Sequence, residues 1–168
     1  MPSIFKVIFG LALILGGIAV ASKFANSAQR SGGTVAADPT IPPANATFVE
    51  ASAEDILGDV ATAKKGVRDQ VAASYQGLWV PSTGWESEVV DVTSERGGTA
   101  VRMQQTSNSF LGGSFYIVAL CPTLDQEVKK GDRATVQGRI KSVDLLPAAA
   151  VPMYRILLHD CRVLKVGK

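Results

Sequence analysis

Histidine and cysteine are scarce in this sequence, which contains one histidine and two cysteines among its 168 residues. The two cysteines stand far apart, so together with a single histidine they do not form the grouped ligand set of a zinc site. They also lack the Cys-x-x-Cys spacing of thiol–disulfide oxidoreductases. No Ser-His-Asp order, glycine-rich phosphate loop or pair of catalytic carboxylates stands out elsewhere. We therefore expect that the protein is not an enzyme and that it binds neither a metal nor a cofactor.

An excess of charge of one sign is missing as well. The 17 Lys and Arg residues nearly balance the 15 Asp and Glu residues, which gives a formal net charge of +2 at pH 7. Nucleic-acid-binding domains usually concentrate basic residues on one surface. The composition therefore argues against nucleic acid as the principal partner.

A hydrophobic run at the N-terminus is the clearest local signal that is present. Residues 4–22, IFKVIFGLALILGGIAVAS, are apolar except for Lys6. The uninterrupted part, roughly fifteen residues, lies between the length of a signal peptide and that of a spanning helix. An Ala-x-Ala cleavage pattern precedes Ser22, so a cleaved signal peptide and a retained membrane anchor both stay open. Either way, residues 1–26 predict a contact with the membrane and a domain on its periplasmic or extracellular side.

Two further segments precede the main domain. Residues 27–48 are rich in Ala, Ser, Gly, Thr and Pro, which predicts a flexible linker. Residues 49–74 then show an amphipathic helical pattern that starts at an N-cap, Ser52. The apolar residues at helical spacing are Ile56, Val60, Ala63, Val67 and Val71. Because the opposite face carries mixed charge, we expect this helix to pack on its own domain and to cover part of the sheet's outer face.

Residues 75–168 have the pattern of a β domain. We predict strands over residues 78–93, 99–106, 114–121, 133–143 and 154–166, separated by the turn signals ERGG, SNSFLGG, KKGD and LLPAAAVP. Five strands with a helical turn after the third is the order of an OB-fold, a small Greek-key barrel. The long first strand of that fold must bend, and Pro81 with Gly84 marks the expected place.

Short stretches of this region resemble a known family. They are SYQG at the end of the helix, TGWESEVVDV, VALC, VKKGDRATVQGRI and LLHDCRV. In these features residues 72–166 are similar to the anticodon-binding-like OB domains of membrane-anchored or exported bacterial proteins. The proline in LWVPSTGW departs from the family's pattern. The resemblance implies a mainly β fold, a five-stranded OB-fold barrel preceded by an amphipathic helix and an N-terminal hydrophobic helix, and says little about activity.

The resemblance also makes the two cysteines informative. In an OB-fold the third and fifth strands are parallel neighbours, so Cys121 and Cys161 would lie near the same end of the barrel. The resemblance therefore implies a disulfide between them, which would suit an oxidising compartment. Two small buried thiols remain the alternative. His159, two residues before Cys161, should share its face; we attribute this spacing to the strand period rather than to a base that activates a thiol.

The third and fifth strands are apolar on both faces, which is the pattern that leads to function. One face should line the interior, and the part of the other left uncovered would suit a protein partner in the cell envelope. The residues expected to contact it are Tyr116, Val118 and Leu120. The alternative is single-stranded nucleic acid or oligosaccharide on the face of the second and third strands. The residues expected for that ligand are Arg96, Arg102, Gln104, Phe110 and Arg139.

Overall fold

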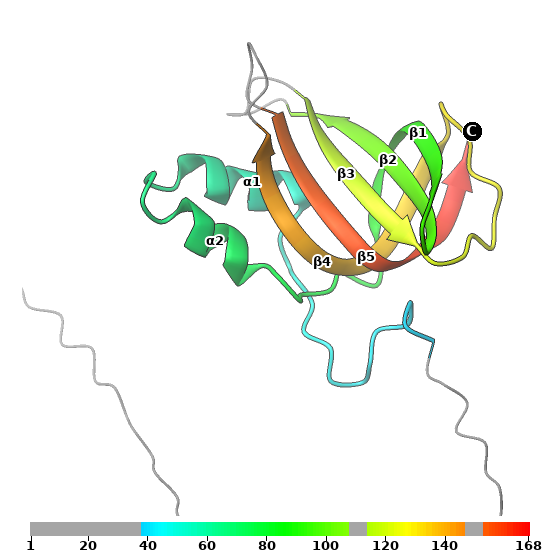
Figure 1. Ribbon diagram of the computed structural model, residues 1–168, viewed down its shortest axis with the longest axis horizontal. Coiled ribbons are helices and arrows are strands. Elements are labelled where there is room, and N and C mark those ends of the chain that lie inside the picture. Colours follow the sequence, from blue (N-terminus) through cyan, green and yellow to red (C-terminus); the bar gives the residue numbers. More distant parts are fainter. Residues whose placement is uncertain (1–37, 108–113, 147–152) are drawn as a thin grey trace, which may run out of the picture. The chain divides into compact units, whose positions relative to one another are not determined.

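The computed structural model describes residues 38–107, 114–146 and 153–168. Two short helices precede five strands (Figure 1). The helices are α1 (Ala53–Thr62) and α2 (Arg68–Ser74); the strands are β1 (Trp85–Glu95), β2 (Gly98–Thr106), β3 (Ser114–Cys121), β4 (Arg133–Leu146) and β5 (Met153–Gly167).

The predicted membrane segment, residues 1–26, lies outside the described ranges, as do the first residues of the predicted linker, up to residue 37. Within those ranges, no helix combines the length and the apolar composition that spanning a membrane requires.

The five strands form one mixed sheet that closes in a ring in the order β1-β2-β3-β5-β4, with β4 returning to β1. Four of the pairings are antiparallel, and β3 with β5 is parallel. The prediction of a mainly β domain with five strands is therefore confirmed. The last four strands begin and end within three residues of their predicted limits.

The first strand differs from its prediction because the chain turns at the expected bend. Residues 78–80 bond separately to β4, through the Val80 amide to the Gly138 carbonyl at 2.9 Å and the Ile140 amide to the Leu78 carbonyl at 2.8 Å. A turn follows, closed by the Gly84 amide donating to the Pro81 carbonyl at 2.8 Å. Gly84 has a φ of +74°, and a Cβ there would lie 2.5 Å from the Thr135 side chain. Only glycine fits this position, and β1 begins directly after it.

The single amphipathic helix predicted for residues 49–74 is wrong, because the segment forms two helices. The first begins as predicted: the Ser52 hydroxyl accepts from the Asp55 amide at 3.1 Å, and the Asp55 carboxylate accepts from the Ser52 amide. It ends where Ala63 turns to an extended conformation with ψ of 142°. Arg68 then donates to the carbonyls of Ala61 and Ala63 at 3.0 and 3.2 Å, which satisfies two of the acceptors left open at the helix end.

The helices do not cover the outer face of the sheet as the sequence analysis predicted. Ile56 and Leu57 of α1 are fully buried in the same hydrophobic core as the inward-facing strand residues. α2 packs against α1 and β4, and the Tyr75 hydroxyl just after it donates to the Asp59 carboxylate of α1 at 2.5 Å. α2 lies beside β4 in Figure 1. Neither helix therefore packs on the outer face of β3.

The described end of the predicted linker is attached to the domain. The Trp79 amide donates to the Thr47 carbonyl at 2.9 Å, and the Val49 amide donates to the Trp79 carbonyl at 2.8 Å. Further back, Thr40 is buried and donates its hydroxyl to the Asp38 carboxylate at 2.7 Å. Residues 38–48 therefore act as part of the folded unit rather than as a free tether.

The helical turn expected between the third and fourth strands is not formed: residues 122–132 contain turns but no helix. Their charged end closes on itself, with the Lys129 amide donating to the Asp132 carboxylate at 2.8 Å. The Gly131 amide donates to the Val89 carbonyl, and the Val89 amide donates to the Asp132 carbonyl, both at 2.8 Å. This turn therefore fastens the start of β4 to the middle of β1.

Candidate binding face

β3 separates the core from the candidate site. Its residues alternate between buried and half-buried along the whole strand. Phe115, Ile117, Ala119 and Cys121 point inward and are fully buried. Tyr116, Val118 and Leu120, the residues predicted to contact a partner, lie on the outer side.

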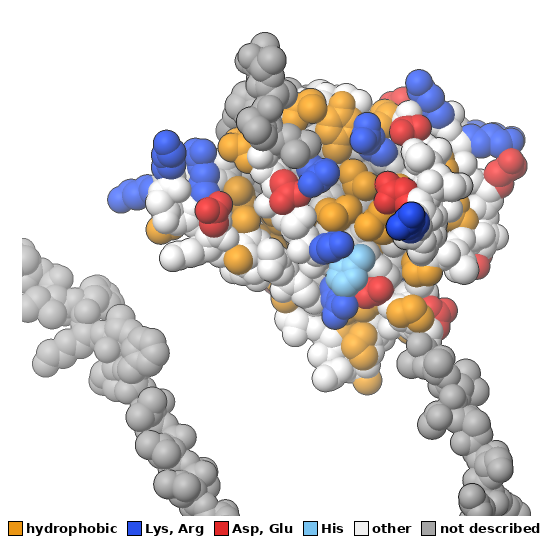
Figure 2. All heavy atoms as spheres, viewed as in Figure 1, with side chains coloured by type: hydrophobic (Ala, Val, Ile, Leu, Met, Phe, Trp, Pro, Cys, Tyr) orange, Lys and Arg blue, Asp and Glu red, His pale blue; other side chains and the backbone are white. Residues whose placement is uncertain are grey.

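The strand register extends this outer side across β2, β5 and β4. Val118 is paired with Arg102 of β2 and with Leu157 of β5, and Leu157 is paired with Ser142 of β4. Because paired residues in a sheet point to the same side, these four side chains form a row. We call the outer surface of β2, β3, β5 and β4 the binding face. In Figure 2, hydrophobic side chains gather over this part of the molecule between basic and acidic ones.

A second row lies beside the first and carries more polar groups. Tyr116 is paired with Gln104 of β2 and Arg155 of β5, and Arg155 is paired with Asp144 of β4. Arg155 donates through two nitrogens to one Asp144 oxygen, at 3.2 and 2.7 Å. The guanidinium carbon of Arg102 lies 5.8 Å from the centre of the Tyr116 ring. The second row thus contributes an aromatic ring that lies under Arg102 of the first row, and a guanidinium group of its own in an ion pair.

A small hollow opens between the two rows. It measures about 130 Å³ and is lined by Arg102, Tyr116, Val118, Met153 and Arg155. Its walls combine an aromatic ring and aliphatic carbon with two guanidinium groups. Such a hollow fits a short side chain that is apolar along its stem and negative at its tip.

A hydrogen-bonded cluster lies at the β4 end of the binding face. Arg139 donates from Nε to His159 Nε2 at 3.1 Å and from Nη2 to the Asp160 carboxylate at 3.1 Å. His159 Nδ1 lies 3.1 Å from the same carboxylate. Burial lowers the pKa of His159, and the nearby Arg139 and Lys141 act in the same direction while Asp160 opposes them. The imidazole is therefore neutral at pH 7, donating from Nδ1 and accepting at Nε2.

The expectation that His159 and Cys161 share a face is wrong. Asp160 between them has a φ of 51°, in the left-handed region that residues other than glycine seldom adopt. The strand therefore gains a bulge, and the alternation of sides changes phase there. His159 lies half-buried on the outside, whereas Cys161 is fully buried in the core.

The structure brings most of the predicted contact residues together. Arg102 and Gln104, predicted for a nucleic acid or oligosaccharide, lie on the same binding face as the residues predicted for a protein partner. Arg139 lies at its edge. Arg96 lies in the β1–β2 turn, where it borders a separate hollow of about 160 Å³ together with Leu120 and His159. Phe110 lies outside the described residues.

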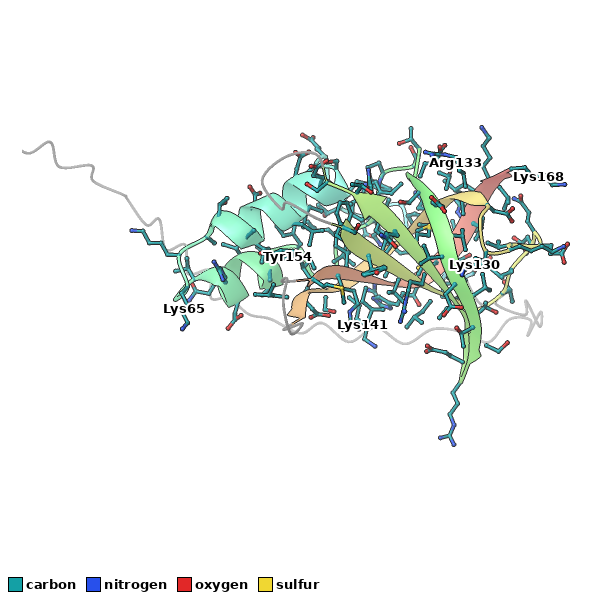
Figure 3. The ribbon with its side chains drawn as sticks, turned by 90° about the horizontal axis from the view of Figure 1, so that it is seen from above. Lys65, Lys130, Arg133, Lys141, Tyr154 and Lys168 are labelled. Atoms are coloured by element: carbon teal, nitrogen blue, oxygen red, sulfur yellow. The ribbon has the colours of Figure 1, made fainter. Side chains whose placement is uncertain are left out.

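Three residues of the face escaped the sequence reasoning: Arg155, Leu157 and Asp144. The signal that could have found Arg155 and Leu157 is the parallel pairing of the third and fifth strands, since it places every second residue of β5 beside the outer residues of β3. Asp144 of β4 follows only from the further pairing of β4 with β5. Exposed Lys141 of β4 adds a further basic side chain and points away from the sheet (Figure 3).

The two cysteines meet inside the ring, directly beneath this surface. Both are present as buried thiols. Burial raises the pKa of the Cys161 thiol well above its ordinary value, and a hydrogen bond with Cys121 adds to the effect. The proximity that the resemblance implied is therefore found, and the disulfide itself stays a prediction.

Metal ligands are not grouped in the described ranges: no cluster of three or more His, Cys, Asp or Glu side chains could hold an ion there. Comparisons with protein-family models, with curated proteins and with solved structures found no match for this chain.

Proposed function

We propose that this chain is a non-catalytic binding module, held at the membrane by its N-terminal segment, that contacts a protein partner through the binding face. We further propose that its domain is an OB-fold barrel of the anticodon-binding-like kind. The strand order β1-β2-β3-β5-β4 with a parallel β3–β5 pair supports this fold, since it is the order expected of an OB-fold. The apolar run of residues 4–22 supports a place in the cell envelope.

One observation carries the functional proposal. The outside of the ring presents Tyr116, Val118, Leu120 and Leu157 side by side, all half-buried, although the core is already filled by the inward-facing residues. The outer side of a sheet normally carries polar residues where it meets water. A contiguous apolar stripe at such a place is typical of a surface that binds another protein.

The charges around the stripe indicate the chemistry of the partner. The charged side chains that neighbour the stripe include four basic ones, Arg102, Arg139, Lys141 and Arg155, and two acidic ones, Asp144 and Asp160, so that among these six the difference 4 − 2 is an excess of two positive charges. Complementary charge steers a partner to its site and fixes its orientation. We therefore propose a partner segment in which aliphatic residues alternate with Asp or Glu.

Co-purification from the solubilised membranes of the native host tests this proposal. Val118→Glu and Leu157→Glu should abolish recovery of a specific partner, because each places a carboxylate in the apolar stripe. Val67→Glu is the matched control, since Val67 is 41% exposed in the turn between the two helices and lies off the binding face. Circular dichroism establishes that all three variants fold. Equal recovery with all three variants would refute the proposal.

A second candidate ligand, single-stranded nucleic acid or an oligosaccharide, is favoured by one observation. The Arg102 guanidinium over the Tyr116 ring forms a stacking surface of the kind that holds bases and sugars. Two of the face's guanidinium groups are already neutralised by Asp144 and Asp160, which disfavours a polyanion. Titration with a fluorescent oligonucleotide at several salt concentrations distinguishes the cases, since phosphate binding weakens steeply as salt rises.

A further inference from the structure

The pair of cysteines lies where two parallel strands separate. The register of β3 with β5 continues to Ala119 opposite Leu158. Extended by two residues, it would place Asp160 opposite Cys121. The bulge at Asp160 instead turns the next residue, Cys161, into the core, where its thiol forms a hydrogen bond with the thiol of Cys121.

A glycine on the neighbouring strand makes room for this arrangement. Gly138 of β4 lies against Cys161, and a Cβ at position 138 would lie 2.4 Å from the Cys161 sulfur. Glycine inside a strand often marks a place where another group approaches closely. Two local departures from ordinary strand structure, at Asp160 and at Gly138, therefore serve the same contact between thiols.

Neither thiol can react readily in the folded domain. Both side chains are fully buried. A thiolate is the species that attacks a disulfide, and burial raises the pKa of the Cys161 thiol. The native domain thus holds two adjacent thiols that are buried away from reagents, and the raised pKa of Cys161 disfavours its thiolate.

We propose that Cys121 and Cys161 form a disulfide only while β5 is not yet docked on β3, so that the folded domain keeps the oxidation state it acquired when it folded. A domain that folds among oxidants is crosslinked, and one that folds among reductants stays a dithiol after transfer to an oxidising buffer. The oxidation state of this pair therefore records the compartment of folding. This inference is independent of any partner at the binding face.

The oxidation needs a disulfide as oxidant, and a low-molecular-weight one such as glutathione disulfide suffices. The thiolate of one cysteine attacks it, which forms a mixed disulfide and releases one glutathione thiolate. The thiolate of the second cysteine then attacks the cysteine sulfur of the mixed disulfide and releases the second. Two cysteine thiols and one glutathione disulfide thus give one protein disulfide and two glutathione thiols, so that atoms and electrons balance.

The test compares folded and unfolded protein in one buffer. The full chain, reduced and purified in mild detergent, is exposed to glutathione disulfide either while folded or in denaturant followed by refolding. At intervals both samples are alkylated in denaturant and their intact masses are measured. We expect the refolded sample to lose two hydrogens and resist alkylation. The sample kept folded should take up two alkyl groups and oxidise at least about 100-fold more slowly, because reaction waits for local opening.

Two results would overturn the proposal. Oxidation of the folded protein at the rate seen in denaturant would show that the fold does not shield the pair. A refolded chain that carries glutathione or free thiols in place of the internal crosslink would show that the two sulfurs are not placed to bond. Cys121→Ala provides the control, because its single thiol can form only the mixed disulfide and so fixes the mass of that product.

Discussion

Replacing Gly138 by alanine should destabilise the domain through one contact. The new Cβ would lie 2.4 Å from the Cys161 sulfur, where ordinary contact begins at 3.4 Å, so the sulfur must retreat by 3.4 − 2.4 = 1.0 Å. It has no free space, because Cys161 is fully buried beside Cys121. The His159 carbonyl at 3.1 Å restricts the methyl group from another side. Overpacking of this kind costs about 1–3 kcal/mol of unfolding free energy.

A double-mutant cycle isolates that contact. Cys161→Ala removes the sulfur and should cost about 1–2 kcal/mol alone, through lost burial. In the double variant the new methyl group at position 138 enters the space the sulfur left. The double variant should therefore be more stable than the sum of the single effects predicts, by about 1–2 kcal/mol.

Urea unfolding of the reduced protein measures these differences, followed by the fluorescence of the buried Trp79 and Trp85. Gly66→Ala is the matched control, since a Cβ there meets nothing within 4 Å. It should leave stability unchanged or raise it by about 0.4–1 kcal/mol. A loss below about 0.5 kcal/mol for Gly138→Ala, or simple additivity in the cycle, would refute the packing described around Cys161.

Three further outcomes follow from local contacts. Ser52→Ala removes the capping bond to the Asp55 amide and should lower the unfolding free energy by about 1 kcal/mol in urea. Burial and then the hydrogen bond to Asp59 raise the pKa of Tyr75 from 10.0 to about 12. The folded state thus keeps this proton longer than the unfolded state, and the unfolding free energy should fall between about pH 10 and pH 12, a fall that Tyr75→Phe removes. Burial lowers the pKa of His159 below 6.5. The neutral imidazole therefore stabilises the fold above pH 6.5, and this stabilisation is lost as the pH falls through the pKa of the folded state. A titration midpoint of His159 at or above 6.5, measured by NMR, would contradict this.

The strands were predictable because runs rich in β-branched and aromatic residues are bounded by turn signals. β3 is such a run: it is apolar on both faces, it follows the turn signal SNSFLGG, and it forms at the predicted residues 114–121. The N-cap at Ser52 was likewise visible from the residue type and the acidic first turn.

What escaped prediction depends on contacts distant in sequence. The end of α1 at Ala63 is fixed in part by Arg68, which caps its carbonyls from beyond the turn, and no periodicity reveals such a bond. The sequence likewise gives no signal for the bulge at Asp160, because the stretch HDC contains no glycine to mark a left-handed residue. Without that bulge the strand period places His159 and Cys161 on one side.

Only part of the candidate site was predictable, because the rest of it depends on contacts between residues distant in sequence. Tyr116 and Val118 follow from the pattern of one strand, whereas Arg155 and Leu157 join them only through the parallel pairing of β3 and β5. That pairing is a property of the closed ring. The β2–β3 register separately places Arg102 beside Val118 and Gln104 beside Tyr116, which brings the two predictions, one for each ligand class, onto a single surface.

Crosslinking from Leu157 tests the central proposal most directly. A photoreactive amino acid at position 157, in the middle of the apolar stripe, is activated by light in cells of the native host, and the same residue at position 67 serves as the control. If the binding face holds a protein partner, position 157 gives a discrete crosslinked protein that position 67 does not give, and Arg102→Glu diminishes it. The absence of any product specific to position 157, in a variant shown to be folded and present at the normal level, would contradict the account.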